Sequence, residues 1–479
     1  MPSDNLIELS ALGIYLALLL AIGISSARNI KTSEDFTLAR RQVTWFVLLA
    51  TTAATMLGGG SSIGSVGNVY KIGIAAAVIV CAWHIQLIFT GLFVAPRLRR
   101  LNLITVGDYF ELKFGRLARD FSTLHCVIFL VGACAAQMVG MGTIMTAVLG
   151  IDYGVALLIA SAVTVFYSTV GGIRAVVRTD VLQFVILVGG LGAAAAILFV
   201  DYGGFSGIMA QVGEERFQLT SNWSAIHLTG LFFAFLLGET FVPPYTTRCF
   251  IAKDERHSRW GVAGAGIFLL LFHPIVIFIL GLSAHIDPAV NAQAAGDVQL
   301  ALPAVVRMLF HPVIAGILVA ALMAAVMSSA DSTLSSLAAI AMEDIFRRHI
   351  NSGAADEALL SVARWTTLVA GVASAVCTFF FDNIIAALEF IYDFWAPGMV
   401  VPFLVGVFWY RGDRIYAVVI SMFAGTLATV VWRFWLQSPW QLSPALFGFV
   451  VAAAALFSSI PLTRNLQLGK LFQPKPSSE

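Results

Sequence analysis

Long apolar segments separated by short polar ones run along almost the whole chain. A membrane-crossing helix needs about 20 mainly apolar residues, and by that criterion the pattern predicts about thirteen spans. Their approximate limits are 6–26, 44–70, 73–96, 121–148, 152–172, 180–200, 226–247, 261–284, 313–341, 363–381, 384–409, 415–435 and 442–461. The pattern therefore predicts an all-α polytopic membrane protein.

Composition supports this class. Hydrophobic residues make up 59% of the chain and charged residues 11%, with a mean hydropathy of +0.88. Soluble domains have about 25% charged residues. A net charge of +1 and the lack of a dense basic tract argue against nucleic-acid binding. The expected partners are membrane lipid and a small-molecule solute, and the oligomeric state stays open.

The basic residues predict an orientation. If the N-terminus lies outside, 24 of the 28 Lys and Arg residues fall in inner segments. The exceptions in the outer segments are Lys71, Arg216, Arg307 and Arg433. Because Lys and Arg concentrate in cytoplasmic loops, this asymmetry predicts an integral protein of the plasma (inner) membrane with its N-terminus outside and its C-terminus in the cytoplasm.

The ninth span carries an acid and several hydroxyls at mid-depth. Asp331 lies near the middle of the apolar segment 313–342, where a carboxylate is costly and marks an ion or substrate site by default. The spacing i, i+3, i+4, i+7 places four residues on one helix face: Ala325, Ser328, Ser329 and Ser332. Oxygen atoms on one face suit a hard cation such as Na+.

Two spans are interrupted. Gly58-Gly59-Gly60 weakens the second span, because each Gly costs about 1 kcal/mol of helix preference relative to Ala. Pro243-Pro244 interrupts the seventh, close to a second acid, Glu239. Breaks in corresponding positions, five spans apart, are typical of inverted-repeat transporters with a midplane site. For the glycines alone, close helix packing is the alternative.

Four segments resemble a known family, the sodium:solute symporters, which include sodium/glucose, proline, pantothenate and sialic acid carriers. They are Phe36–Arg41 followed by Trp45, Ser62–Gly73, Gly171–Gln183, and Ala325–Ser336 followed by Glu343-Asp344-Ile345. The resemblance covers residues 6–461. It implies a LeuT-type core of five plus five inverted helices, formed by the second to the eleventh spans.

The resemblance divides the chain into an extra helix with an inner loop (1–43), core helices 1–6 (44–260), core helices 7–10 (261–410) and two extra helices with a tail (411–479). It implies sodium-coupled import of a small organic solute by alternating access, with Na+ as coupling ion and no organic cofactor.

The resemblance also implies the site residues. A principal sodium site would use backbone carbonyls and hydroxyls of Ala54, Leu57, Ala325, Ser328 and Ser329. A second cation site, present in some members, would use Asp180, Asp331 and Ser332, although those members carry a small hydroxyl residue where this chain has Asp331. The substrate-binding residues would be Met56, Gly58, Ser61, Gln137, Glu239 and Tyr245.

Two acids have alternative interpretations. Asp180 is either a cation ligand or an inner-surface acid paired with Arg174 or Arg178. Glu239 either favours a cationic or zwitterionic solute, because an opposite charge satisfies a buried acid, or it caps the broken backbone or pairs with Arg248.

Other functions are weighed against sodium symport. A proton-coupled carrier is the nearest alternative, because Asp180, Glu239 and Asp331 are able to exchange protons. A transporter-like sensor or channel is a second alternative. An enzyme is not expected, because the chain has neither a zincin motif nor a Ser-His pair at a recognisable spacing.

Overall fold

The computed structural model describes residues 32–220, 224–381, 383–411, 414–463 and 466, with scattered positions between 7 and 25. Most of the predicted first span and the polar tail at 473–479 lie outside the described residues. In the described part, nine helices are long and apolar enough to cross a membrane, or eleven if each of two bent pairs is one span. The protein is all-helical, as predicted.

The long elements match the predicted spans closely. They are α3 (Trp45–Met56) with η2 (Gly60–Gly64) and α4 (Ser65–Ile72), α5 (Ile74–Phe89) with η3 (Thr90–Val94) and α6 (Ala95–Arg100), α8 (Arg116–Leu149), α9 (Tyr153–Asp201), α11 (Ala225–Gly238) with α12 (Pro243–Ile251), α13 (Glu255–Ser283), α16 (Pro312–Ile340) with η6 (Ala341–Ile350), α17 (Asp356–Cys377), α18 (Ile384–Phe408), α19 (Ile415–Val430) with η9 (Val431–Trp435), and α20 (Pro444–Thr463).

Short helices occupy the connections. They are α2 (Ser33–Leu38), η1 (Ala39–Arg41), α7 (Val106–Phe114), α10 (Gly204–Val212), η4 (Glu214–Phe217), α14 (Pro288–Gly296), η5 (Val298–Leu300), α15 (Ala301–Leu309), η7 (Thr378–Phe380) and η10 (Pro439–Gln441). The connections at 201–220 and 285–312 therefore contain helical turns.

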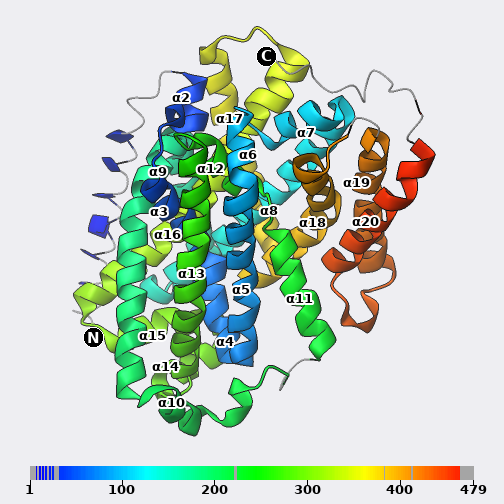
Figure 1. The fold of residues 1–479 in the computed structure, drawn as a ribbon. Coiled ribbons are helices and arrows are strands. Elements are labelled where there is room, and N and C mark those ends of the chain that lie inside the picture. Colours follow the sequence, from blue (N-terminus) through cyan, green and yellow to red (C-terminus); the bar gives the residue numbers. More distant parts are fainter. Residues whose placement is uncertain are drawn as a thin grey trace.

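The long helices form one bundle. Figure 1 shows α3, α13 and α5 side by side at its centre, and α13 packs against both of the others. The helix α9 lies at one edge, and α19 and α20 pack together at the opposite edge. The centre of the bundle, where α3 and α16 also meet, holds both interrupted spans.

The spans predicted at 152–172 and 180–200 fall within one helical element, α9. Its two ends lie on the same side of the bundle, because Tyr153 interacts electrostatically with Asp297 and Tyr202 with Asp287, the residues that cap the two ends of the short helix α14. A nine-residue helix is about 14 Å long, so the 49 residues of α9 cross the bundle and return rather than extend as one straight rod.

Candidate functional site at two broken helices

The first break lies between α3 and η2. The helix axes bend by 57° there, across Leu57, Gly58 and Gly59. Irregular backbone at membrane depth needs partners from the protein. Side chains supply them: the Gly59 amide donates to Gln137 Oε1 at 3.0 Å, and the Ser62 hydroxyl donates to the Leu57 carbonyl at 2.8 Å. The predicted unwinding at the glycines is confirmed.

The second break lies between α11 and α12, with a bend of 41°. Phe241, inside it, has φ +63°, a conformation that is an outlier for a bulky residue and costs on the order of 1–3 kcal/mol. The helix α18 supports this segment from the side. Its Tyr392 hydroxyl donates to Glu239 at 2.6 Å, and the Trp395 indole donates to the Thr240 carbonyl at 2.9 Å.

A cavity of about 50 Å³ lies between the two breaks. All six residues that the family resemblance assigns to the solute line it: Met56, Gly58, Ser61, Gln137, Glu239 and Tyr245. A water molecule needs about 10–15 Å³ by this measure, so the cavity has room for only a handful of waters. A solute therefore requires side chains or helices to move apart.

The other lining residues were not assigned to the solute by the sequence analysis, although Ser329 was assigned to sodium and Gly60 and Pro244 to the two breaks. They are Thr55, Gly60, Trp83, Phe129, Ala133, Val242, Pro244, Ser329, Thr333 and Leu388. Several neighbour a residue that was singled out, so adjacency was an available signal for them. Trp83, Phe129 and Leu388 carried no such signal, because an apolar side chain in an apolar span does not show which way it faces.

The predicted sodium residues lie where α16 meets the end of α3. The Ser329 hydroxyl is 3.0 Å from the Thr55 carbonyl and 3.1 Å from the Ala325 carbonyl. All five predicted residues are buried. Ser328 turns to α9 instead and donates its hydroxyl to Asp180. The structure thus joins α16 to the first break through Ser329.

The residues predicted for a second cation do not surround one point. Arg248, on α12 and fully buried, lies 3.3 Å from Asp180 and 3.1 Å from the Ser332 hydroxyl. Its guanidinium also donates to the Thr55 hydroxyl. Asp331 accepts a hydrogen bond from Ser168 instead. A protein cation therefore already contacts two of the three predicted ligands.

This arrangement revises both alternative interpretations of the acids. Asp180 has no exposed surface, and Arg248 of α12 is an ion-pair partner of its carboxylate. The side chain of Arg174 lies outside the described residues. Arg248 does not pair with Glu239, whose hydrogen-bond donor is Tyr392.

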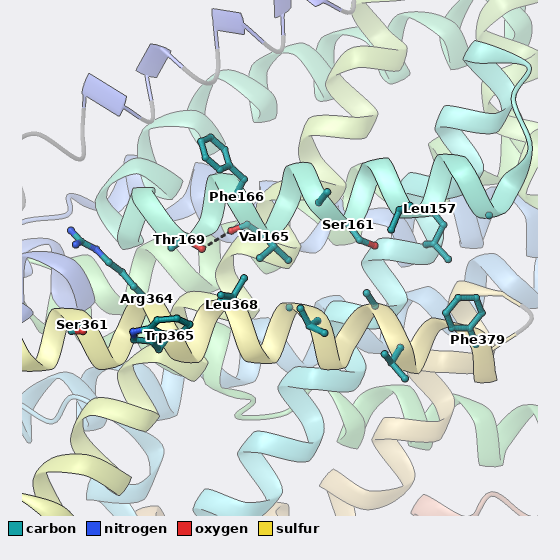
Figure 2. A pocket seen from close by; sticks show the side chains of 17 residues that line it. Leu157, Ser161, Val165, Phe166, Thr169, Ser361, Arg364, Trp365, Leu368 and Phe379 are labelled. Atoms are coloured by element: carbon teal, nitrogen blue, oxygen red, sulfur yellow. Dashed lines mark hydrogen bonds between the residues drawn. The ribbon is translucent and has the colours of Figure 1, made fainter.

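A larger hollow lies elsewhere. The groove between α9 and α17 measures about 950 Å³, and Figure 2 shows its lining. Phe166, Trp365 and Phe379 are 70%, 65% and 79% exposed along it, so it faces the surroundings of the bundle. The hydrogen bond drawn there is the local one from Thr169 to the Val165 carbonyl. Solute sites have convergent polar groups, which favours the smaller central cavity as the functional site.

Comparison with known proteins decides the family. The model of the sodium:solute symporter family matches residues 36–425. The chain belongs to this family. Among its relatives, the sodium/glucose cotransporter of Vibrio parahaemolyticus is 26% identical, with 90% of this chain and 85% of that protein covered. The sodium/proline symporter of Escherichia coli (strain K12) is 25% identical, with 95% and 92% covered.

Solved structures of symporters share the fold. An outward-open, substrate-bound Na+-coupled sialic acid symporter has a TM-score of 0.82 at 22% identity, with 97% of this chain and 99% of that chain covered. Mhp1, a nucleobase-cation-symport-1 family transporter, has a TM-score of 0.56 at 13% identity, with 91% and 96% covered. The predicted family and the LeuT-type fold are confirmed. As a sodium:solute symporter, the protein is an integral membrane carrier that couples solute transport to sodium.

Proposed function

We propose that the coupling sodium ion binds between the first break and α16. Its ligands are the carbonyl oxygens of Ala54, Leu57 and Ala325 and the hydroxyl oxygens of Ser328 and Ser329. Hard cations prefer such oxygen ligands. The observation that carries the proposal is the contact of Ser329 with the Thr55 carbonyl at 3.0 Å, which brings the hydroxyl face of α16 to the end of α3.

Asp180 contacts one of the proposed sodium ligands, the Ser328 hydroxyl. The Ser328 hydroxyl donates a hydrogen bond to the Asp180 carboxylate, which leaves the lone pairs of the hydroxyl oxygen free for a cation. The carboxylate also adds negative charge next to the ion. Asp180 is thus a positioning residue for the sodium ligand rather than a ligand itself.

We further propose that the carrier uses one sodium ion. Arg248 provides the positive charge that balances Asp180, and it occupies the space between Asp180 and Ser332. Burying a second cation beside this guanidinium would place like charges together in a region of low dielectric constant, which is unfavourable. With Asp180 balanced by this fixed cation, its carboxylate is not left over to hold a second transported ion.

The solute class follows from the central cavity. Glu239 is the acid that lines it, and its hydrogen-bond partner is a neutral hydroxyl, Tyr392. A buried carboxylate is most cheaply satisfied by an opposite charge. We therefore propose that the solute carries an ammonium group, as a cation or as a zwitterion. The proline carriers among the relatives are named for a solute of this kind.

Alternating access then follows because each ligand contacts two segments of the bundle and so favours one arrangement of them. Sodium joins α3 to α16, and the solute joins the first break to the second through Gly58, Ser61 and Glu239. Each ligand shifts the equilibrium only by its difference in affinity for the two states. Reciprocity requires that each also raise the affinity for the other.

The sodium assignment is tested with the double substitution Ser328→Ala and Ser329→Ala. Interactions with a charged group are worth about 1.5–3 kcal/mol, so losing two ligands raises the half-saturating sodium concentration at least tenfold. Initial uptake rates in proteoliposomes measure this. Ser336→Ala is the matched control, because Ser336 bonds only to the Ser332 carbonyl on its own helix. An unchanged sodium dependence in the double variant would refute the assignment.

The solute class is tested with Glu239→Gln, which removes the charge and keeps the size. We expect uptake and binding of ammonium-bearing solutes to fall at least tenfold, while sodium still stabilises the purified protein against heating. A thermal-shift screen with and without sodium identifies the solutes. If Glu239→Gln leaves every ammonium solute bound as before, the proposed class is wrong. Uptake that persists in sodium-free buffer at low pH would instead favour proton coupling.

A further inference from the structure

Two buried histidines connect three elements of the bundle. His84 on α5 and His273 on α13 are 0% and 1% exposed, and their rings meet with Nε2 of His84 3.0 Å from Nδ1 of His273. The other nitrogen of His273, Nε2, lies 2.9 Å from the carbonyl oxygen of Ser61 in η2. Nothing in the sodium or solute site described above uses these rings.

The direction of both hydrogen bonds is fixed by chemistry. A carbonyl oxygen only accepts, so Nε2 of His273 carries the proton that it donates to Ser61. Neither ring has an acidic partner within ion-pair distance among the described residues, so a charged ring would lie buried without a counter-ion, which is costly. With both rings neutral, Nδ1 of His273 is an acceptor, and Nε2 of His84 donates to it.

One acceptor is left over. Nδ1 of His84 is buried and has no hydrogen-bond partner among the described residues. The two hydrogen bonds therefore run in one direction, from His84 through His273 to the Ser61 carbonyl. Both rings are held in the same tautomer, with the proton on Nε2.

The end of this chain lies beside the solute cavity. Ser61 lines the cavity, and its hydroxyl donates to the Met56 carbonyl and lies 3.3 Å from the Gly58 carbonyl across the break. Fixing the Ser61 backbone therefore fixes a hydroxyl that spans the unwound segment. It also fixes where η2 begins.

Close packing also connects α13 to α4 and α5 at other points along the bundle. A Cβ atom added to Gly281 of α13 would lie 2.6 Å from the Val69 side chain and 2.8 Å from the Val66 carbonyl of α4. One added to Gly266 of α13 would lie 2.9 Å from the His84 carbonyl of α5. Small residues allow such approach between membrane helices. The helices α4, α5 and α13 thus form one unit, and His273 attaches the break to it.

We propose that His273, supported by His84, is a positioning residue of the solute site: it holds the Ser61 carbonyl and so sets the geometry of the broken helix at the cavity. This proposal rests on the proposed function in one respect, that the cavity binds the solute. It assigns the pair no proton transfer and no contact with the solute.

Substitutions at His273 test the hydrogen bond to Ser61 separately from sodium binding. His273→Leu removes the donor to Ser61, and we expect the KM for solute to rise several-fold to about tenfold, the range for one lost neutral hydrogen bond. The half-saturating sodium concentration at saturating solute stays within about twofold. His273→Gln carries an amide N–H that is able to reach Ser61, and it restores most of the solute KM. His125→Leu is the matched control, because His125 is also buried and contacts the Phe121 carbonyl, away from the cavity.

A spectroscopic measurement tests the chain without reference to any solute. Nitrogen NMR of ¹⁵N-histidine-labelled protein in bilayers, with His84→Gln and His273→Gln used for assignment, should show both rings protonated on Nε2 only. A proton on Nδ1 of His273 would overturn the proposal. So would a His273→Leu protein that folds and keeps the wild-type solute KM, or a His273→Gln protein as impaired as His273→Leu. If Glu239→Gln leaves solute uptake unchanged while the tautomers are as described, the proposed solute site fails and the histidine chain stands.

Discussion

Replacing Arg248 with Met tests whether the guanidinium balances Asp180. Met has a similar length and no charge. Both partners of the pair are fully buried, and the substitution leaves the carboxylate with only the hydroxyls of Thr51 and Ser328 as donors. Breaking a buried pair by removing one partner costs about 3–5 kcal/mol. We expect the Arg248→Met protein to unfold at a clearly lower temperature than the wild type in choline chloride.

Sodium should then stabilise the variant more than the wild type. Without the guanidinium, Asp180 and the hydroxyls of Ser328 and Ser332 offer a cation an oxygen-lined position. A ligand at 100 times its Kd stabilises the folded state by about 2.7 kcal/mol, so a second sodium ion recovers much of the loss. Thermal unfolding of purified protein in NaCl and in choline chloride at equal ionic strength measures this difference. In uptake assays, the Hill coefficient for sodium should rise from about one toward two.

Two further variants make this test decisive. Asp180→Asn combined with Arg248→Met removes both charges, and it should be more stable than Arg248→Met alone because no unpaired charge remains. Arg433→Met is the matched control, since Arg433 pairs with Asp393 away from α16 and is partly exposed. Equal stabilisation by sodium of the wild type and of Arg248→Met would refute the idea of a fixed cation. A double variant less stable than Arg248→Met would refute it as well.

Two more predictions concern the first break and the ninth span. Gly58→Ala should lower the maximal uptake rate at least tenfold, because its Cβ would lie 3.1 Å from Ser329 Cβ and 3.2 Å from Gln137 Oε1. Gly296→Ala is the control, because a Cβ added at Gly296 would have nothing within 4 Å. Normal uptake by Gly58→Ala would contradict the close approach of these residues. Asp331→Asn keeps a partner for Ser168 and should leave the ratio of sodium to solute unchanged in reversal-potential measurements. A changed ratio would place Asp331 in the ion path.

Local chemistry made the breaks predictable. Three consecutive glycines weaken a helix interior, and two consecutive prolines fit only the first turn of a helix, so the structure bends by 57° at the glycines and by 41° just before the prolines. Because both breaks lie at similar depth in the bundle, the polar residues next to them meet at one cavity. Met56, Gly58, Ser61, Glu239 and Tyr245, which the family resemblance implied, therefore line the same cavity.

Side-chain pairing was not predictable in the same way. Arg248 lies nine residues after Glu239 in the chain, yet the turn before α12 directs it to Asp180 on a different helix. Asp331 was grouped with Ser332, its neighbour in sequence, but adjacent residues on a helix point in different directions. The pairing of His84 with His273 joins helices whose rotation about their axes no local pattern reports.

The small volume of the central cavity bears on how the carrier avoids an uncoupled leak of sodium. A centre of about 50 Å³ admits neither a hydrated sodium ion nor an organic solute until the bundle loosens. An empty carrier in this conformation therefore does not let sodium leak across the membrane, and the sodium gradient that drives transport is preserved. The same narrowness means that a blocking compound would have to enter from a widened state and hold it open.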